Sequence, residues 1–271
     1  MGMGTSLTEE AKQVAQAFVA ARRDKRGLPV YPGTAPSDMP GAYRIQNLAI
    51  GMDGRPIAGW KVGKINPPED ARLGANRLSG PIFVDSIVDA RAGDVPAMPV
   101  FADGFAAAEA EFLLHVAPGW NGAVPADDAG VRALLDAVHV GIEIASSPYP
   151  GINADGPPVT ASDFGNNHGL VIGPPLAGGQ ALDFDSILVR LEIDGEVAGE
   201  NTTANMLDGP IGAVRFLLGN LNERGINCSE GTWVSTGAVT GVHPVKPGES
   251  VRAVFGDKGE LGCTIVAARP D

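Results

Sequence analysis

Two glutamates interrupt an apolar run in the segment AEAEFLLHV, residues 108–116. Side chains two residues apart on a β-strand point to the same side, so Glu109 and Glu111 would lie about 7 Å apart on one face. Burying two like charges costs free energy unless a positive group lies between them. The spacing therefore predicts either a solvent-facing strand or a pair of acids that share a cation.

A third acid, Glu143, stands in a second apolar run, HVGIEIAS, residues 139–146. Strand alternation puts it on the face opposite Ile142 and Ile144. Three carboxylates without clustered histidines or cysteines favour a hard dication, Mg²⁺ or Mn²⁺, over zinc. At this point an acidic face on an open sheet remains the alternative.

Further motifs extend over most of the chain. They are ARRDKRGLPVYPG, AYRIQ, GWKVGKINPPEDARLGA, the two glutamate strands, ASDFGNNHGLVIG and STGAVTGVHPVKPGE. In these motifs the chain resembles the 2-keto-4-pentenoate hydratase and 4-oxalocrotonate decarboxylase family, within the fumarylacetoacetate hydrolase superfamily.

The resemblance implies a metal centre and an acid–base group. Glu109, Glu111 and Glu143 would bind one Mg²⁺ or Mn²⁺, which chelates a 2-oxo acid through its keto oxygen and carboxylate and stabilises an enolate. Lys61 would be the acid–base group, with its pKa lowered by burial beside the dication. Thr236 would donate a hydrogen bond to the substrate carboxylate.

Two positions depart from the family pattern. Leu78 stands where family hydratases carry an acid, and Phe164 follows Asp163 where an Asn is usual. Arg72 and Arg77, in the preceding loop, could recognise a second carboxylate on the substrate. The overall resemblance favours a hydratase of a 2-hydroxypenta-2,4-dienoate-like substrate, whereas Leu78 and the two arginines favour decarboxylation of an oxalocrotonate-like diacid.

Two other functions are alternatives. An acylpyruvate C–C hydrolase of the same superfamily activates water with a His–Glu pair from its N-terminal region, and no histidine precedes His115 here. A non-catalytic metabolite-binding protein is the remaining possibility, and the retention of Lys61 argues against it.

The periodicity of apolar residues predicts the elements that hold these side chains. Helices are predicted over 6–27, with Ser6 and Glu9 at capping-box spacing, and over 42–52, 127–138 and 208–225; strands over 57–65, 108–116, 139–146 and 169–175; a polar loop over 66–81; and hairpins over 187–200, around Asp194-Gly195, and over 249–266. The fold class is therefore α+β. A small helical N-terminal subdomain, residues 1–78, carries the lysine strand and a lid-like loop, and residues 79–271 form a β-rich metal-binding catalytic domain. The resemblance implies that this second domain is a mixed β-sandwich or roll.

Composition limits the partners and the compartment. A net charge of −12 argues against nucleic acid and anionic membranes, which need basic surfaces. No apolar run approaches the ~20 residues of a membrane span, and the start MGMGTSLTEEAKQ lacks a signal-peptide core, so a cytoplasmic protein with Cys228 and Cys263 as reduced thiols is expected. The expected partners are a small 2-oxo acid, further copies of the chain in a homo-oligomer, and an enzyme of the same pathway.

Overall fold

The structure, a computed structural model, describes residues 7–270. Its helices are α1 (Leu7–Arg23), α2 (Met39–Asp53), α3 (Glu69–Leu73), α4 (Asp128–Ala133), α5 (Pro157–Ser162) and α6 (Gly209–Glu223). Its strands are β1 (Ile57–Lys64), β2 (Arg77–Phe83), β3 (Ile87–Asp89), β4 (Ala97–Val100), β5 (Phe105–Val116), β6 (Leu135–Ser147), β7 (Asn167–Pro175), β8 (Val189–Ile193), β9 (Glu196–Asn201), β10 (Thr232–Ser235), β11 (His243–Pro244), β12 (Ser250–Phe255) and β13 (Gly259–Ala267).

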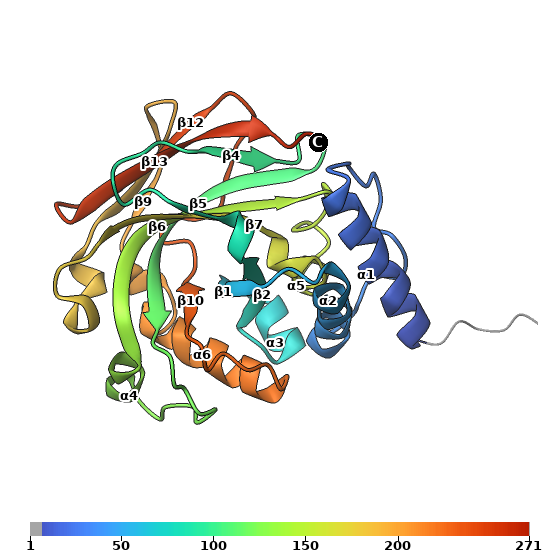
Figure 1. Cartoon of the computed structure of the whole chain (residues 1–271), viewed down its shortest axis with the longest axis horizontal. Coiled ribbons are helices and arrows are strands. Elements are labelled where there is room, and N and C mark those ends of the chain that lie inside the picture. The colour runs from blue at the N-terminus through green and yellow to red at the C-terminus, as the bar shows by residue number, and fades with distance from the viewer. Residues whose placement is uncertain (1–6, 271) are drawn as a thin grey trace, which may run out of the picture.

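Two sheets form the body of the molecule. The larger has the strand order β2-β1-β10-β5-β6-β7-β3, with β11 added beside β5, and the smaller has the order β4-β13-β12-β8-β9. Figure 1 shows the smaller sheet stacked against the long, curved strands β5 and β6. Phe112 of β5 contacts Phe184 and Phe255 edge to face, with ring centroids 5.0 and 5.2 Å apart, so the main core lies between the sheets.

The larger sheet is curled. Ile82 of β2, Leu113 of β5 and Leu170 of β7 belong to one buried cluster, although β2 and β7 lie far apart in the strand order. Leu113 shares its strand face with Glu109 and Glu111, because side chains alternate along β5. The acids therefore lie on the inner side of the curl, away from the main core.

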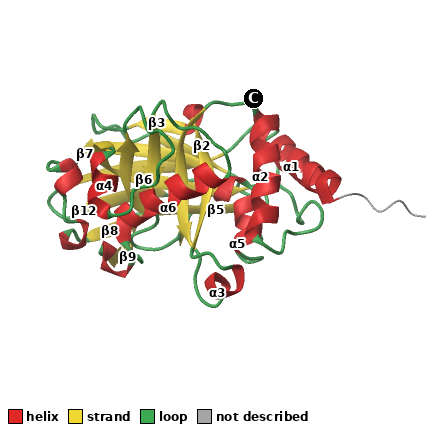
Figure 2. Ribbon diagram, turned by 90° about the horizontal axis from the view of Figure 1, so that it is seen from below, coloured by secondary structure: helices red, strands yellow, loops and turns green. Residues whose placement is uncertain are grey.

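Helices pack at one end of the molecule and across the strands (Figure 2). Figure 2 shows α1, α2 and α5 gathered at one end of the molecule, and α6 lying across the strands. The start of α2 is fixed by Asp38, whose side chain accepts a hydrogen bond from Gly41 N, and its end by Gly54 in the left-handed conformation. Leu217 and Leu221 of α6 are fully buried in the main core with Trp60 of β1.

The predicted α+β class and the mixed β architecture are confirmed, and two local predictions are wrong. The helix predicted over 127–138 ends at Ala133, because Leu135 already begins the long strand β6. The polar loop predicted over 66–81 contains α3 and most of β2. The predicted domain boundary at residue 78 falls inside β2, which pairs with β1 in the larger sheet.

Three smaller expectations concern the chain ends, the thiols and the membrane. The predicted cap at Ser6 lies outside the described residues. Cys228 and Cys263 are buried, free cysteines. Among residues 7–270, no helix combines the length and the apolar character that crossing a bilayer requires.

Candidate metal and active site

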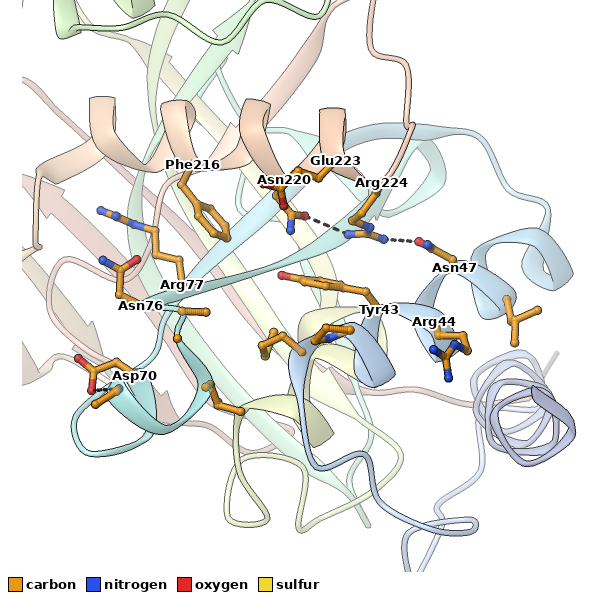
Figure 3. A pocket seen from close by; sticks show the side chains of 17 residues that line it. Tyr43, Arg44, Asn47, Asp70, Asn76, Arg77, Phe216, Asn220, Glu223 and Arg224 are labelled. Atoms are coloured by element: carbon orange, nitrogen blue, oxygen red, sulfur yellow. Dashed lines mark hydrogen bonds between the residues drawn. The ribbon is translucent and has the colours of Figure 1, made fainter. Parts of the chain in front are cut away.

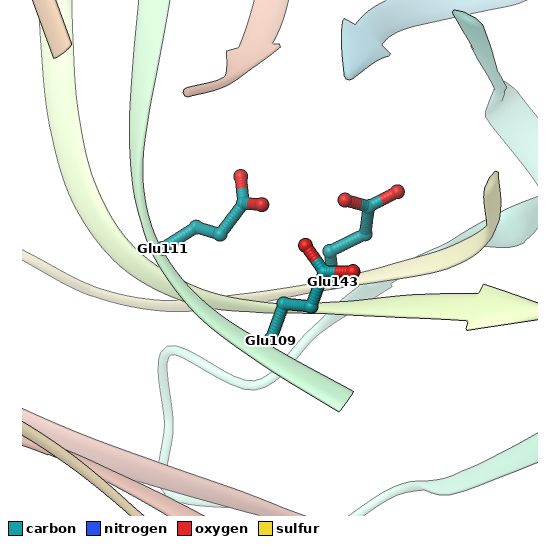
Figure 4. Close-up of side chains that lie close together, drawn as sticks. All are labelled: Glu109, Glu111 and Glu143. Atoms are coloured by element: carbon teal, nitrogen blue, oxygen red, sulfur yellow. The ribbon is translucent and has the colours of Figure 1, made fainter. Parts of the chain in front are cut away.

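Three buried carboxylates converge inside the curled sheet. Glu109 and Glu143 are direct partners across the β5–β6 pair, and Glu111 lies opposite Gly141. Glu109 is 4% exposed and the other two acids are fully buried. One oxygen from each acid lies within 4.8 Å of the others, and Figure 4 shows the three side chains reaching into the same space.

In Glu111 and in Glu143, hydrogen bonds hold one carboxylate oxygen, and the other oxygen accepts no hydrogen bond. Glu111 Oε2 accepts hydrogen bonds from Ser235 Oγ at 2.5 Å and from Gly237 N at 2.9 Å. Glu143 Oε1 accepts one from Asn167 Nδ2 at 2.9 Å. Glu111 Oε1 and Glu143 Oε2 are buried without a hydrogen-bond partner. Buried polar atoms without partners are rare, and two such oxygens in one acidic cluster fit a site built for a cation.

The raised pKa values of two of these acids also fit a site for a cation. Burial raises the pKa of Glu109 to about 7, while the ammonium of Lys61 works to lower it. Burial and the charges of Glu143 and Glu109 together raise the pKa of Glu111 well above its usual value. A divalent cation between the carboxylates would favour their charged forms and reverse both shifts.

Lys61, on β1, lies beside the three acids. Its Nζ is 3.3 Å from Glu143 Oε2 and donates a hydrogen bond to Asn166 Oδ1 at 3.4 Å. The side chain is buried, which works to lower the pKa of Lys61, but the three carboxylates outweigh burial and raise it instead. The family resemblance predicts a lowered pKa for Lys61. Beside the three carboxylates the pKa is raised instead, because their attraction for the ammonium exceeds the cost of its burial.

A cavity of about 910 Å³ opens onto Lys61 and Glu109. Thr236 lines it, with its hydroxyl donating to Phe112 O at 2.8 Å, so its role as donor to a substrate carboxylate stays a prediction. Leu78 also lines the cavity and belongs to a small apolar cluster with Met39.

The cations near the cavity differ from those expected. Arg72 is exposed and lies outside the cavity lining, where it binds Glu69 and donates to Ser37 O at 3.0 Å. Arg77 does line the cavity, but it is buried in an ion pair with Asp208, with Nη2 2.5 Å from Oδ1. Lys64 lines the cavity as well and has no ion pair among residues 7–270.

Sequence reasoning missed the side chains that hold the acids and the lysine in place. Asn166, Asn167, Ser235 and Gly237 all lie in motifs that carry the family resemblance, but small polar residues give no signal of which atoms they bind. Hydrogen bonds between residues far apart in sequence become visible only when the strands are assembled.

A second cavity, of about 1210 Å³, lies outside the curl between α2, α6 and the loop after α3 (Figure 3). The guanidinium of Arg224 lies 4.4 Å from the ring centre of Tyr43 on its wall and donates to Asn47 Oδ1 at 2.5 Å. Arg77 lines both cavities. The two cavities therefore both reach the beginning of β2.

The chain is similar in sequence to known enzymes over part of its length. No family model matches the chain. A 4-oxalocrotonate decarboxylase from Pseudomonas putida is 28% identical over 136 residues, which are 50% of this chain and 51% of that protein. One from Pseudomonas sp. (strain CF600) is 31% identical over 121 residues, 45% of this chain and 46% of that protein. The chain thus matches about half the length of these curated relatives.

Solved structures match over a longer stretch. A 4-oxalocrotonate decarboxylase from Pseudomonas putida G7, complexed with magnesium and adipate, has a TM-score of 0.77 at 21% identity, covering 95% of this chain and 98% of that one. Fumarylpyruvate hydrolase from Pseudomonas aeruginosa, in complex with Mn²⁺ and pyruvate, has a TM-score of 0.55 at 18% identity, covering 79% and 91%. At such identities the likeness shows the fold. The resemblance predicted from the motifs is confirmed: over about half its length the chain is similar to 4-oxalocrotonate decarboxylases, and it shares their fold.

Proposed function

We propose that this protein is a divalent-metal-dependent decarboxylase of 2-oxo diacids of the 4-oxalocrotonate type. The observation that carries the proposal is the convergence of Glu109, Glu111 and Glu143 beside the buried Lys61. A cavity lined by Lys61 and Glu109 adjoins them and is large enough for a small acid. Similarity to two 4-oxalocrotonate decarboxylases supports the choice of reaction.

The three acids would hold Mg²⁺ or Mn²⁺. Their hard oxygen ligands suit these ions. Glu111 Oε1 has no hydrogen-bond partner, and Glu143 Oε2 has only the ion pair with Lys61, so these two atoms are available to bind one. Such an ion supplies a Lewis acid that polarises the 2-oxo group and stabilises negative charge on its oxygen. The relatives with magnesium or Mn²⁺ in their structures are consistent with this assignment.

Lys61 would act as the general acid. In decarboxylation the bond to the departing carboxylate breaks, its electron pair moves through the conjugated carbons to the 2-oxo oxygen, and CO₂ leaves. The Lys61 ammonium, held beside the acids, can protonate that oxygen and then regain a proton from water. This role requires only that its Nζ reach the 2-oxo end of the bound substrate.

Leu78 favours decarboxylation over hydration. Overall sequence resemblance alone favours hydration. Hydration needs a polar group that places water near the far end of the conjugated chain. Leu78 instead presents an apolar side chain to the cavity, packed in a cluster with Met39 and Ile65. Similarity to two 4-oxalocrotonate decarboxylases supports the same choice, so hydration becomes the second candidate.

The distal carboxylate of a diacid would be recognised by Lys64, with Arg77 behind it. Lys64 is exposed at the cavity wall and has no ion pair among the described residues, so its charge is available. Arg77 shares its charge with Asp208. Arg72, one of the two arginines that the sequence suggested for this role, is held by Glu69 outside the cavity lining.

A direct assay tests the proposal. Purified protein with Mg²⁺ is incubated with 2-oxo-3-hexenedioate and, separately, with 2-hydroxypenta-2,4-dienoate, while CO₂ release and dienol absorbance are followed independently. We expect CO₂ from the diacid and slow or no loss of the dienol. Efficient hydration of the dienol without CO₂ release from the diacid would replace decarboxylase with hydratase.

A further inference from the structure

The side chain of Arg22, at the end of α1, reaches into the body of the protein. It is buried and forms a two-pronged ion pair with Asp163, with Nε 2.6 Å from Oδ1 and Nη2 2.8 Å from Oδ2. Asp163 Oδ2 also accepts a hydrogen bond from Ser147 Oγ at 2.6 Å. Arg22 Nη1 donates to the backbone oxygen of Asn167 at 3.0 Å. One guanidinium thus binds both ends of the segment 163–167.

The backbone between those ends is in an unusual conformation. Phe164, Gly165 and Asn166 have φ angles of 54°, 62° and 59°, in the left-handed region that side-chain-bearing residues rarely adopt. Each such non-glycine residue costs on the order of 1 kcal/mol or more and persists only when its surroundings hold it in place. The turn therefore depends on the contacts at its two ends.

This turn presents two amides to the site. Asn166 Oδ1 accepts the hydrogen bond from Lys61 Nζ, and Asn167 Nδ2 donates to Glu143 Oε1. A second contact, from Asn166 Nδ2 to Asn153 Oδ1 at 2.9 Å, orients the Asn166 amide. The segment that Arg22 binds is thus the segment that orients Lys61 and Glu143.

We propose that Arg22 is a positioning residue for this centre, although it contacts none of the three acids nor Lys61. By fixing both ends of the left-handed turn it holds Asn167 on Glu143 and Asn166 on Lys61. Its effect on metal binding therefore passes through Asn167, and its effect on the lysine passes through Asn166. This inference rests on the proposed metal site, and it assigns to α1 a role beyond covering the sheet.

A double-mutant cycle tests this coupling without relying on turnover. The Kd of Mn²⁺ is measured by electron paramagnetic resonance of free Mn²⁺ for wild type, Arg22→Lys, Asn167→Ala and the double variant. Lysine keeps the charge but cannot bind both ends at once. We expect each single change to raise the Kd by roughly tenfold, as is usual when a partner of a metal ligand is lost. The double variant should be no weaker than Asn167→Ala alone, because the two changes break one chain of contacts.

The matched control is Val14→Ala, which also loosens the packing of α1. It should lower the melting temperature and leave the Kd of Mn²⁺ unchanged, so a Kd that rises equally in this variant would make Arg22 merely structural. Wild-type affinity in Arg22→Lys, or additive losses in the double variant, would also overturn the inference. A wild type that binds Mn²⁺ but releases no CO₂ contradicts only the proposed reaction, whereas a wild type that binds no Mn²⁺ contradicts both.

Discussion

Glu109 and Glu143 lie directly opposite each other on β5 and β6, as register partners within a buried sheet. Like charges at opposed positions destabilise a sheet, and here both carboxylates are buried, so solvent screens the repulsion only weakly. Lys61 supplies one positive charge to Glu143, so a single ammonium faces three carboxyl groups. The arrangement makes thermodynamic sense when a divalent ion completes it.

The first prediction is that divalent ions stabilise the protein. A bound ion present at about 100 times its Kd adds roughly 2.7 kcal/mol to the free energy of unfolding. The melting temperature with Mg²⁺ or Mn²⁺ should therefore be higher than the melting temperature with a chelator. Glu111→Gln should lose this shift, and in chelator it should melt no lower than wild type, because one buried charge is removed. Glu230→Gln, at an exposed acid, is the control and should keep the full shift.

The second prediction separates Lys61 from the metal. Lys61→Met should reduce kcat by ~10²–10⁴, the range for a positioned acid–base group. It should leave the Kd of Mn²⁺ unchanged or lower, because the cation that neutralises Glu143 in competition with the metal is gone. Unchanged turnover in this variant would remove Lys61 from the mechanism.

The third prediction uses Lys64 on the same strand. Lys64→Met should raise KM for the diacid and raise kcat slightly, because its attraction to the departing carboxylate stabilises the bound substrate and is lost as CO₂ forms. The KM for a 2-oxo acid that lacks the distal carboxylate should not change. Equal effects on both substrates would mean that Lys64 does not recognise that group.

The fourth prediction concerns Leu78. Leu78→Asp should increase hydration of a short dienoate, because it places a proton-accepting group in the cavity, and should lower the melting temperature, because it buries another acid. Leu78→Asn, of similar size but unable to act as a base, is the control. If both variants hydrate as slowly as wild type, the residue at this position does not decide the reaction.

The fifth prediction is a pH dependence of stability caused by His168. Burial, reinforced by the charge of Arg22, lowers the pKa of His168 from 6.5 to about 3. Between these values the unfolded chain binds a proton that the folded protein does not, so the free energy of unfolding falls as the pH drops below 6.5. In chelator, denaturant titrations at pH 7 and pH 5 should show a larger loss for wild type than for His168→Gln. Equal losses would show that His168 takes up its proton in the folded state.

Strand alternation made the acidic cluster predictable. Alternation puts Glu109 and Glu111 on one face of their strand and Glu143 on the face opposite Ile142 and Ile144, while the choice of an inward face rests on the family resemblance. The hairpin at Asp194-Gly195 was equally readable, and both residues have the positive φ angles, 51° and 82°, that tight hairpin turns require. These features are local, so the sequence around them contains the information needed.

Other parts of the site depend on contacts that no local pattern encodes. Arg72 and Lys64 look equivalent in sequence, and only the fold shows that Glu69 holds Arg72 outside the cavity lining. The helix predicted over 127–138 failed for a related reason: the pairing of β6 with β5 overrides helical periodicity after Ala133. The left-handed turn at Asn166 could not be expected from a segment with only one glycine inside it.

The parallel pairing of β1 with β10 sets the order in which this protein can be completed on the ribosome. Lys61 pairs with Ser235, which follows it by 174 residues (235 − 61) in the sequence, and β10 is the strand that joins β1 to β5. Until β10 has been synthesised, β1 with its apolar Trp60 lacks this neighbour, and Lys61 is not tied to the acids through the sheet. Such long-range pairing slows folding and leaves apolar surface exposed in the meantime. A nascent chain therefore carries all three acids and the lysine well before it can bring them together.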